Sequence, residues 1–308
     1  LEPLARRAPS AHNTQPWTLD YADHLTIGWD PARELPAGDP TRRDLYLSLG
    51  AFIETYLIAA ADAGLPIRAE IAVDPDRRQI ARLHPARECY STPYTARTIT
   101  ARGCARGTYE NGRLRTEELA RVREQLRCTA LVELPAKALV ARALRADRWL
   151  FGNPAVVREL RTWLRLRRGD AAGDGLTAEA LGLSAAEAVA FRAALAGLGP
   201  LHRLGLPGLL ARAQAGLLRY DGSVLVLTGA QDSPTEMVEA GRDLVRAWYA
   251  LTELDLAVHP LSQLLDCPAT SADLHRTLNA RPLAAFRAGR PATPPPRSAR
   301  LATPAPRP

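Results

Sequence analysis

One polar stretch near the start of the chain, residues 7–17, reads Arg7-Ala8-Pro9-Ser10-Ala11-His12-Asn13-Thr14-Gln15-Pro16-Trp17. Its two prolines restrict the backbone at either end, and several hydrogen-bonding side chains lie between them. The residues alone leave two interpretations open. The stretch is either an ornate turn before a strand, or a rigid loop that presents Ser10, Asn13 and backbone N–H groups to a flat polar ligand.

The segments after this loop carry alternating strand and helix patterns. Residues 17–21 and 25–29 alternate apolar and polar side chains, which predicts a hairpin. Apolar residues between positions 45 and 60 recur at helical spacing. Residues 67–73 and 79–83 then predict a second pair of strands. The first part of the chain is therefore expected to be a sheet flanked by a helix.

The second part of the chain repeats this order. Residues 223–229 form an uninterrupted apolar run of strand type, and Ser233 and Glu236 then form a capping box at the start of a helix. A shift of 191 residues places Gly50 on Gly241, and each lies in a predicted helix that leads into an extended segment. This offset predicts two copies of one α+β unit.

Two further segments differ from these units in composition. Residues 164–218 are rich in Leu, Ala and Gly, show helix signals without a strand pattern, and are expected to be a helical insertion that covers a site. Residues 291–308 contain seven prolines in 18 positions. We expect them to form an extended arm rather than a packed element.

Composition argues against several classes of protein. The net charge of +7 comes from 39 Arg and a single Lys spread along the whole chain, without an aromatic platform, so no nucleic-acid partner is expected. The sequence has no run of about 18 consecutive apolar residues, so no membrane partner is expected. The cysteines lack zinc-site spacing, so no metal is expected, and such sparse thiols fit a reduced, cytoplasmic location.

Motifs for several common activities are also missing. The single lysine, Lys137, follows Ala136, which excludes the G-K-[ST] of a P-loop. There is no G-x-S-x-G nucleophile elbow. The Gly197-Leu198-Gly199 run follows a helical segment rather than a strand, so a Rossmann fingerprint is not supported.

The loop at residues 7–17 resembles the P-S-x-x-N-x-Q-P-W loop of FMN-dependent nitroreductases. It is most similar to the form found in duplicated, Acg-type NAD(P)H nitroreductases. In that family the loop contacts the flavin from across a dimer interface. The resemblance implies that Ser10, His12, Asn13 and Gln15 bind FMN, and that NAD(P)H is the electron donor.

A second stretch, Arg102-Gly103-Cys104-Ala105-Arg106-Gly107, is similar to the family's R-x-[ST]-x-[RK] segment. The resemblance implies that Arg102 holds the FMN phosphate and that Arg106 faces the pyrimidine edge of the ring. Cys104 stands where the family has a hydroxyl, which removes a good donor to the phosphate. Taken alone, arginines four apart are also common on a solvated helix face.

Matches near the end of the chain complete the resemblance. Residues 282–289 resemble the family's last strand, whose arginine reaches the phosphate, and this implies a role for Arg287. Residues 260–263 resemble the segment beside the flavin ring, which adds Ser262. The loop lies in the first half and the arginines in the second, so the chain is expected to build one flavin site from both halves.

The resemblance therefore implies an α+β fold with two fused nitroreductase-like domains that form an internal pseudo-dimer within a monomer. The first domain would cover residues 1–100 and the second residues 101–290, with the insertion at 164–218 and the arm at 291–308. The implied function is an FMN-dependent oxidoreductase that transfers hydride from NAD(P)H to a small acceptor such as a nitroaromatic or a quinone. No side chain is required as an acid or base, so none is assigned as catalytic.

Three alternatives stay open at this point. The protein could bind and sequester flavin without turnover beneath a closed insertion. It could also be a remodelled biosynthetic enzyme of the same fold, including one that has lost the flavin, which the replacement at Cys104 would permit. A structural or partner-binding role is the third.

Overall fold

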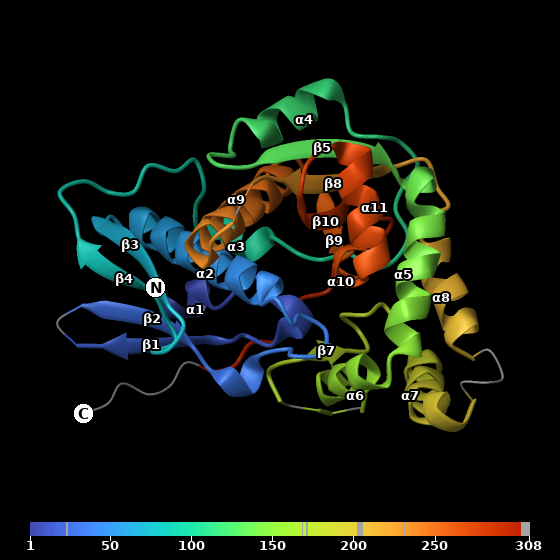
Figure 1. Ribbon diagram of the computed structural model, residues 1–308. Helices are drawn as coiled ribbons and strands as arrows, with labels where there is room; N and C mark the ends of the chain where they lie inside the picture. Colours follow the sequence, from blue (N-terminus) through green and yellow to red (C-terminus); the bar gives the residue numbers. More distant parts are fainter. Residues whose placement is uncertain (23, 168, 171, 202–205, 231, 303–308) are drawn as a thin grey trace.

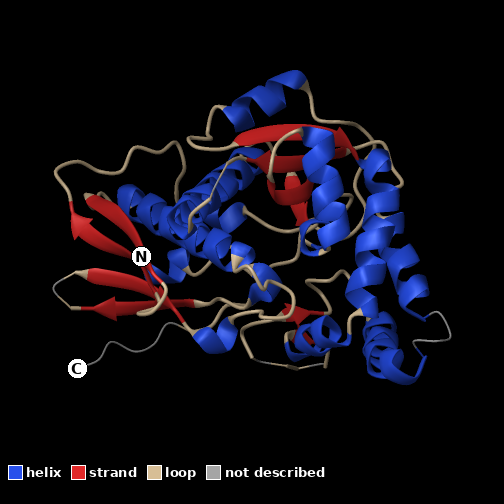
Figure 2. Ribbon diagram, in the orientation of Figure 1, coloured by secondary structure: helices blue, strands red, loops and turns tan. Residues whose placement is uncertain are grey.

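Two long helices cross in the centre of the molecule, with one sheet on either side of them (Figures 1 and 2). The computed structural model describes residues 1–302 apart from positions 23, 168, 171, 202–205 and 231. The described helices are α1 (Glu2–Ala5), α2 (Arg43–Asp62), α3 (Ala96–Ala101), α4 (Thr116–Arg123), α5 (Val140–Gly152), α6 (Pro154–Thr162), α7 (Ala185–Leu201), α8 (Leu206–Gly216), α9 (Pro234–Thr252), α10 (Gln263–Asp266) and α11 (Pro268–Leu278). Short 3-10 turns are η1 (Ala11–Asn13), η2 (Pro31–Arg33) and η3 (Ala136–Leu139).

Both main sheets are four-stranded and antiparallel. The first has the order β1-β2-β4-β3, with bounds Trp17–Tyr21, Leu25–Trp29, Gln79–Pro85 and Ile67–Asp74. The second has the order β5-β8-β10-β9, with bounds Ala130–Pro135, Ser223–Thr228, Pro282–Gly289 and Ala257–Pro260. The fold is therefore a mixture of helices and sheets in which helices flank the sheets, as the α+β prediction required.

Local sequence signals predicted several of these elements correctly. Trp17 pairs with Trp29 in the expected hairpin, and α2 is followed by Gly64 at φ +70°. The capping box at the start of α9 is present, since Ser233 Oγ accepts from the Glu236 N–H while the Glu236 carboxylate accepts from the Ser233 N–H. Each of these signals acts over a few residues, so it needs no tertiary contact to take effect.

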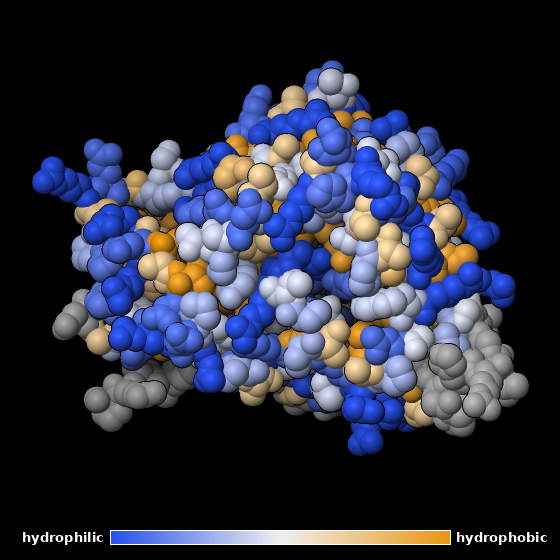
Figure 3. All heavy atoms as spheres, viewed as in Figure 1, coloured by the Kyte–Doolittle hydropathy of each residue, from blue (hydrophilic) through white to orange (hydrophobic). Residues whose placement is uncertain are grey.

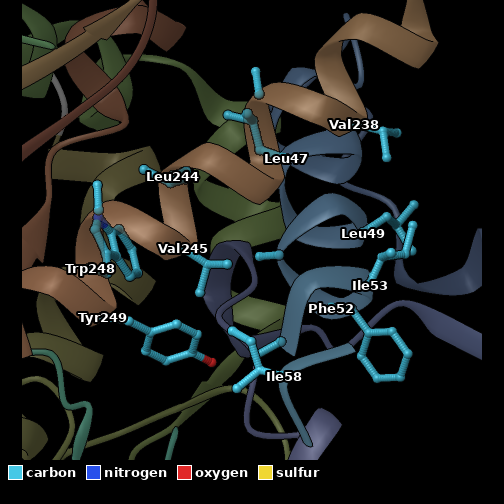
Figure 4. Packing of buried hydrophobic residues seen from close by; sticks show 14 of the residues in the cluster. Leu47, Leu49, Phe52, Ile53, Ile58, Val238, Leu244, Val245, Trp248 and Tyr249 are labelled. Atoms are coloured by element: carbon cyan, nitrogen blue, oxygen red, sulfur yellow. The ribbon is translucent and has the colours of Figure 1, made fainter. Parts of the chain in front are cut away.

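The crossing of α2 and α9 depends on two glycines. A Cβ on Gly50 would lie 1.9 Å from the Val238 carbonyl oxygen, and one on Gly241 would lie 2.3 Å from the Leu47 carbonyl oxygen. Only residues without a Cβ let the two backbones approach this closely. The pair found at the 191-residue offset thus marks the helix crossing, and apolar side chains of both helices interdigitate around it (Figure 4).

A buried ion-pair network fixes the same two helices. The carboxylate of Glu54, on α2, accepts from Arg242 Nε at 2.9 Å and from Arg246 Nη2 at 2.7 Å, both on α9. It also accepts from the Tyr90 hydroxyl at 2.8 Å. Because Glu54 is only 1% exposed, loss of either arginine would leave a buried charge without full compensation. The network therefore favours one register of the crossing.

The insertion at residues 164–218 departs from its prediction. It contains a two-residue parallel pair, β6 (Leu164–Arg165) with β7 (Leu176–Thr177), so the absence of strands was wrong. Helix α8 packs on α5, and Phe151 and Val157 form a separate apolar cluster with residues of α7 and α8. Positions 168, 171 and 202–205 of the insertion lie outside the described residues.

Helix α2 is long and apolar enough to cross a membrane by length and composition alone. Sixteen of its residues, from Leu45 to Ala60, are buried in the protein, as expected for a core helix. The face of the molecule in Figure 3 is largely hydrophilic, with apolar residues scattered in small groups. The apolar composition of α2 therefore reflects its place in the core.

We predict that Gly50→Ala destabilises the protein by about 1–3 kcal/mol or more, because the new Cβ forces apart two packed backbones. Gly208→Ala in α8 is the matched control, since a Cβ there meets nothing within 4 Å. It should be neutral or stabilising by up to about 1 kcal/mol. Urea unfolding measures both, and equal effects would contradict the proposed role of the glycine crossing.

Candidate functional site

A cavity of about 270 Å³ lies where the polar loop, α2, α9, the second sheet and the arm meet. Most of the predicted site residues line this cavity, although they come from distant parts of the sequence. Those that line it are Ser10, His12, Asn13, Arg102, Cys104, Arg106 and Ser262. The side chains of Gln15 and Arg287 do not line it. The described part of the insertion contributes only Leu176, so its helices do not cover the cavity.

The loop has an unusual backbone that its own side chains stabilise. His12, Asn13 and Gln15 all have φ between 48° and 55°, a left-handed conformation that non-glycine residues seldom adopt. Ser10 Oγ accepts from the Gln15 N–H at 2.9 Å and closes the turn. A second hydroxyl, that of Ser48 on α2, accepts from the Ala11 N–H at 3.4 Å. Such strain persists where surrounding contacts over-determine the conformation.

Asn13 connects the loop to two other segments. Its Nδ2 donates to the Gly175 carbonyl at 3.1 Å and to the Ala299 carbonyl at 3.2 Å, while its Oδ1 accepts from Arg300 Nη1 at 3.1 Å. Asn13 thus joins the loop to the insertion and to the arm. The amide that the resemblance assigned to a flavin contact already has partners on both of its polar atoms.

Gln15 makes a similar connection away from the cavity. Its Nε2 donates to the Gly173 carbonyl at 2.9 Å, and its Oε1 accepts from the Leu301 N–H at 3.0 Å. The arm was expected to be extended but not packed, and the second part of that prediction was wrong. Residues 299–301 are packed against the start of the chain and the loop, because carbonyl and amide groups there supply hydrogen-bond partners that an isolated proline-rich arm lacks. Residues 303–308 lie outside the described range.

The arginine segment reaches the cavity from α3. Arg102 is 8% exposed; its Nη2 donates to the Arg7 carbonyl at 2.7 Å, and its Nη1 contacts Cys104 Sγ at 3.7 Å. The guanidinium also lies over the Trp248 ring at 5.9 Å. Arg106 donates from Nη1 to the Ala180 carbonyl of the insertion at 2.8 Å. Cys104 therefore stands as a weak acceptor beside Arg102.

Arg287 is fully buried outside the cavity, in contrast to the phosphate contact that the resemblance implied. Its Nη1 donates to the Leu217 carbonyl at 2.8 Å and its Nη2 to the Gly107 carbonyl at 2.9 Å. The guanidinium lies over the Tyr109 ring at 4.5 Å, and it contacts His259 Nδ1. Because its donors are occupied by the protein, Arg287 positions the chain next to Arg106.

An acidic group that the sequence analysis missed lines the other part of the cavity. Arg43 Nη2 pairs with Asp44 at 2.8 Å and with Asp266 at 2.6 Å. Asp39 lies in the same group, and its carboxylate accepts from the Leu45 N–H at 3.0 Å. Burial, followed by the Asp44 charge, raises the pKa of Asp39 to about 8. No local motif could have revealed this group, since Asp266 is more than 200 positions away from the others.

His12 is neutral at physiological pH. Burial lowers the pKa of its imidazole to about 4, with Asp44 opposing and Arg106 adding to this shift. A neutral ring has one donor and one acceptor nitrogen. His12 therefore adds no charge to the cavity where it lies between acidic and basic groups.

Unpartnered donors show what kind of ligand would fit. Arg7 Nε, Arg102 Nε and Trp248 Nε1 are buried without a hydrogen-bond partner, and all three residues line the cavity. No carboxylate of the described residues lies within 4.0 Å of Arg7 or Arg102. Apolar side chains supply the adjoining wall, among them Leu47, Leu244 and Phe286. These features fit a ligand that combines an anionic group with a flat apolar part.

Comparisons with known proteins indicate the family to which the chain is similar. No family model matches the chain. The Mycobacterium tuberculosis protein named "Putative NAD(P)H nitroreductase acg" is 38% identical over 74 residues, which is 24% of this chain but only 22% of that protein. The Serratia sp. protein named "Probable NAD(P)H nitroreductase PigM" is 24% identical over 309 residues, covering 92% of this chain and 84% of PigM. These matches support assignment of the chain to the nitroreductase family, as the loop motif predicted, and their names point to NAD(P)H-dependent oxidoreduction.

We predict that Asp39→Asn stabilises the protein increasingly as the pH rises. A carboxyl whose folded pKa is raised contributes stability at low pH and loses it as the pH passes through about 8. The unfolding temperature of the variant minus that of the native protein should therefore grow from about pH 5 to about pH 9. Asp255→Asn, at an exposed position, is the control, and an equal slope in both variants would contradict the assignment.

Proposed function

We propose that the protein is an FMN-dependent oxidoreductase that transfers hydride from NAD(P)H to a small acceptor such as a nitroaromatic or a quinone. One observation carries the proposal. The motif loop and the arginine segment, 85 or more residues apart, line one cavity in which the buried Nε donors of Arg7 and Arg102 lack acceptors. Such donors are costly to bury without a partner, and the phosphate of FMN would supply one.

The residues present suggest a division of roles. Arg7 and Arg102 would neutralise the phosphate, and Arg106 would face the pyrimidine edge of the ring. Trp248, with its apolar neighbours, would lie against the ring and exclude water from it. FMN, when bound, supplies the electron transfer itself. For this reason we assign no side chain as a catalytic acid or base.

We further infer an internal pseudo-dimer. Ser10 and Asn13 come from the first domain of the predicted boundaries, and Arg102, Arg106 and Ser262 come from the second. A site shared in this way needs no second chain, so a monomer is proposed. The described cysteines Cys89, Cys104 and Cys267 are thiols rather than disulfides, which supports the proposed cytoplasmic location.

We predict that the purified protein binds about one FMN per chain. Asn13→Ala and Arg106→Ala should each weaken binding by roughly 1–3 kcal/mol, because each change leaves buried polar groups unpaired. Arg87→Ala, at an exposed position outside the cavity, is the control and should bind FMN normally. Fluorescence titration measures all three, and a colourless protein that cannot be reconstituted would contradict the proposal.

A flavin reservoir is the second candidate function, and one contact favours it. Arg106 is bonded to Ala180 of the insertion, and Leu176 also lies against the cavity, so the insertion contacts the proposed flavin site. If the site nevertheless opens, anaerobic NADPH or NADH should bleach the bound flavin, and a quinone should restore the colour. If dithionite bleaches it while neither nicotinamide does, the protein is a reservoir.

A further inference from the structure

Four arginines gather at one end of the cavity, and two of them come from the C-terminal arm. Arg7 and Arg102 come from the loop and the arginine segment, whereas Arg297 and Arg300 follow the last strand. We propose that residues 295–301 belong to the binding site. Together with Arg7 and Arg102 they complete a pocket that binds a phosphate monoester. The inference rests on the proposed function in taking this phosphate to be that of FMN.

The arm is seated on the site by specific contacts. Arg300 donates from Nε to the Arg6 carbonyl at 2.7 Å and from Nη2 to the Arg7 carbonyl at 3.0 Å. At Gly103, between the two key positions of the arginine segment, a Cβ would lie 2.6 Å from Pro295 Cγ. The arm therefore contacts both stretches that carry the resemblance. Arg300 acts as a positioning residue, since its donors are occupied by the loop.

The positive charges of the four arginines favour an anionic ligand at this end of the cavity. No carboxylate of the described residues forms an ion pair with any of the four arginines. The pKa of Arg300 is lowered to about 9, because the residue is buried and because the charges of Arg102 and Arg7 repel its own charge. Arg297 is exposed and lies at the edge of the cavity, so its side chain can turn toward a ligand. A dianion among them would relieve the repulsion and satisfy the buried Nε donors.

The test compares ligands that differ by one phosphate. The titrations measure the affinity of Arg297→Ala, Arg300→Ala and Gly103→Ala for FMN against riboflavin, and for NADPH against NADH. Gly103→Ala keeps every charge but displaces Pro295, and Arg87→Ala is the control for loss of an exposed arginine. Thermal unfolding of each variant verifies that the fold is kept.

We expect Arg300→Ala to weaken FMN binding by about 10-fold or more and Arg297→Ala by about 3-fold, with riboflavin changed less than about 2-fold. Gly103→Ala should change the affinities for FMN and riboflavin in the same way as Arg300→Ala. A selective loss for NADPH with FMN unchanged would also support the pocket but assign it to the dinucleotide. Equal losses for FMN and riboflavin would overturn the inference, as would tighter FMN binding, which would make the arm a plug.

Failure of the proposed function has a separate signature. If the unmodified protein binds neither flavin nor nicotinamide, pyrophosphate serves as the probe of the pocket. A rise in unfolding temperature with pyrophosphate that is lost in the double variant of Arg297 and Arg300 would still support the phosphate pocket. No rise in the unmodified protein would overturn it.

Discussion

The close crossing of α2 and α9 is the contact on which the rest of the structure depends. Gly50 and Gly241 let the backbones meet, and the buried pairs of Glu54 with two arginines of α9 fix the register. The same helices then supply facing walls of the cavity, with Leu47 from α2 and Trp248 from α9. A shift of one helix along the other would separate these walls. Packing in the core thus sets the shape of the site.

The polar loop is the second constraint, because it joins parts of the chain that lie far apart in the sequence. Asn13 and Gln15 hold the insertion on one side and the arm on the other. The resemblance assigned both side chains to the cofactor, yet in this structure they mainly bind backbone groups. A residue can therefore belong to a cofactor motif by organising the segments that surround the cofactor, rather than by touching it.

Sequence reasoning succeeded where the signal is local or is carried by a long motif. Strand alternation and helix caps act over a few residues, and the family resemblance placed seven of its nine site residues on the wall of one cavity. It failed where tertiary contacts decide the outcome. The docking of the arm depends on carbonyl groups of residues 6–8, nearly 300 positions earlier. The buried position of Arg287 depends on the Tyr109 ring and on the carbonyl groups of Leu217 and Gly107. The acidic group around Arg43 likewise forms only in the folded chain.

The two ends of the cavity therefore differ in charge. Arginines without a carboxylate partner among the described residues lie at one end, and three aspartates lie around Arg43 at the other. Together with the apolar wall, this arrangement is suited to an elongated ligand with an anionic terminus. A crystal structure of the protein grown with FMN tests that claim most directly. The account predicts flavin density in this cavity, with the phosphate beside Arg7 and Arg102. Flavin bound elsewhere, or an empty cavity at saturating FMN, would contradict it.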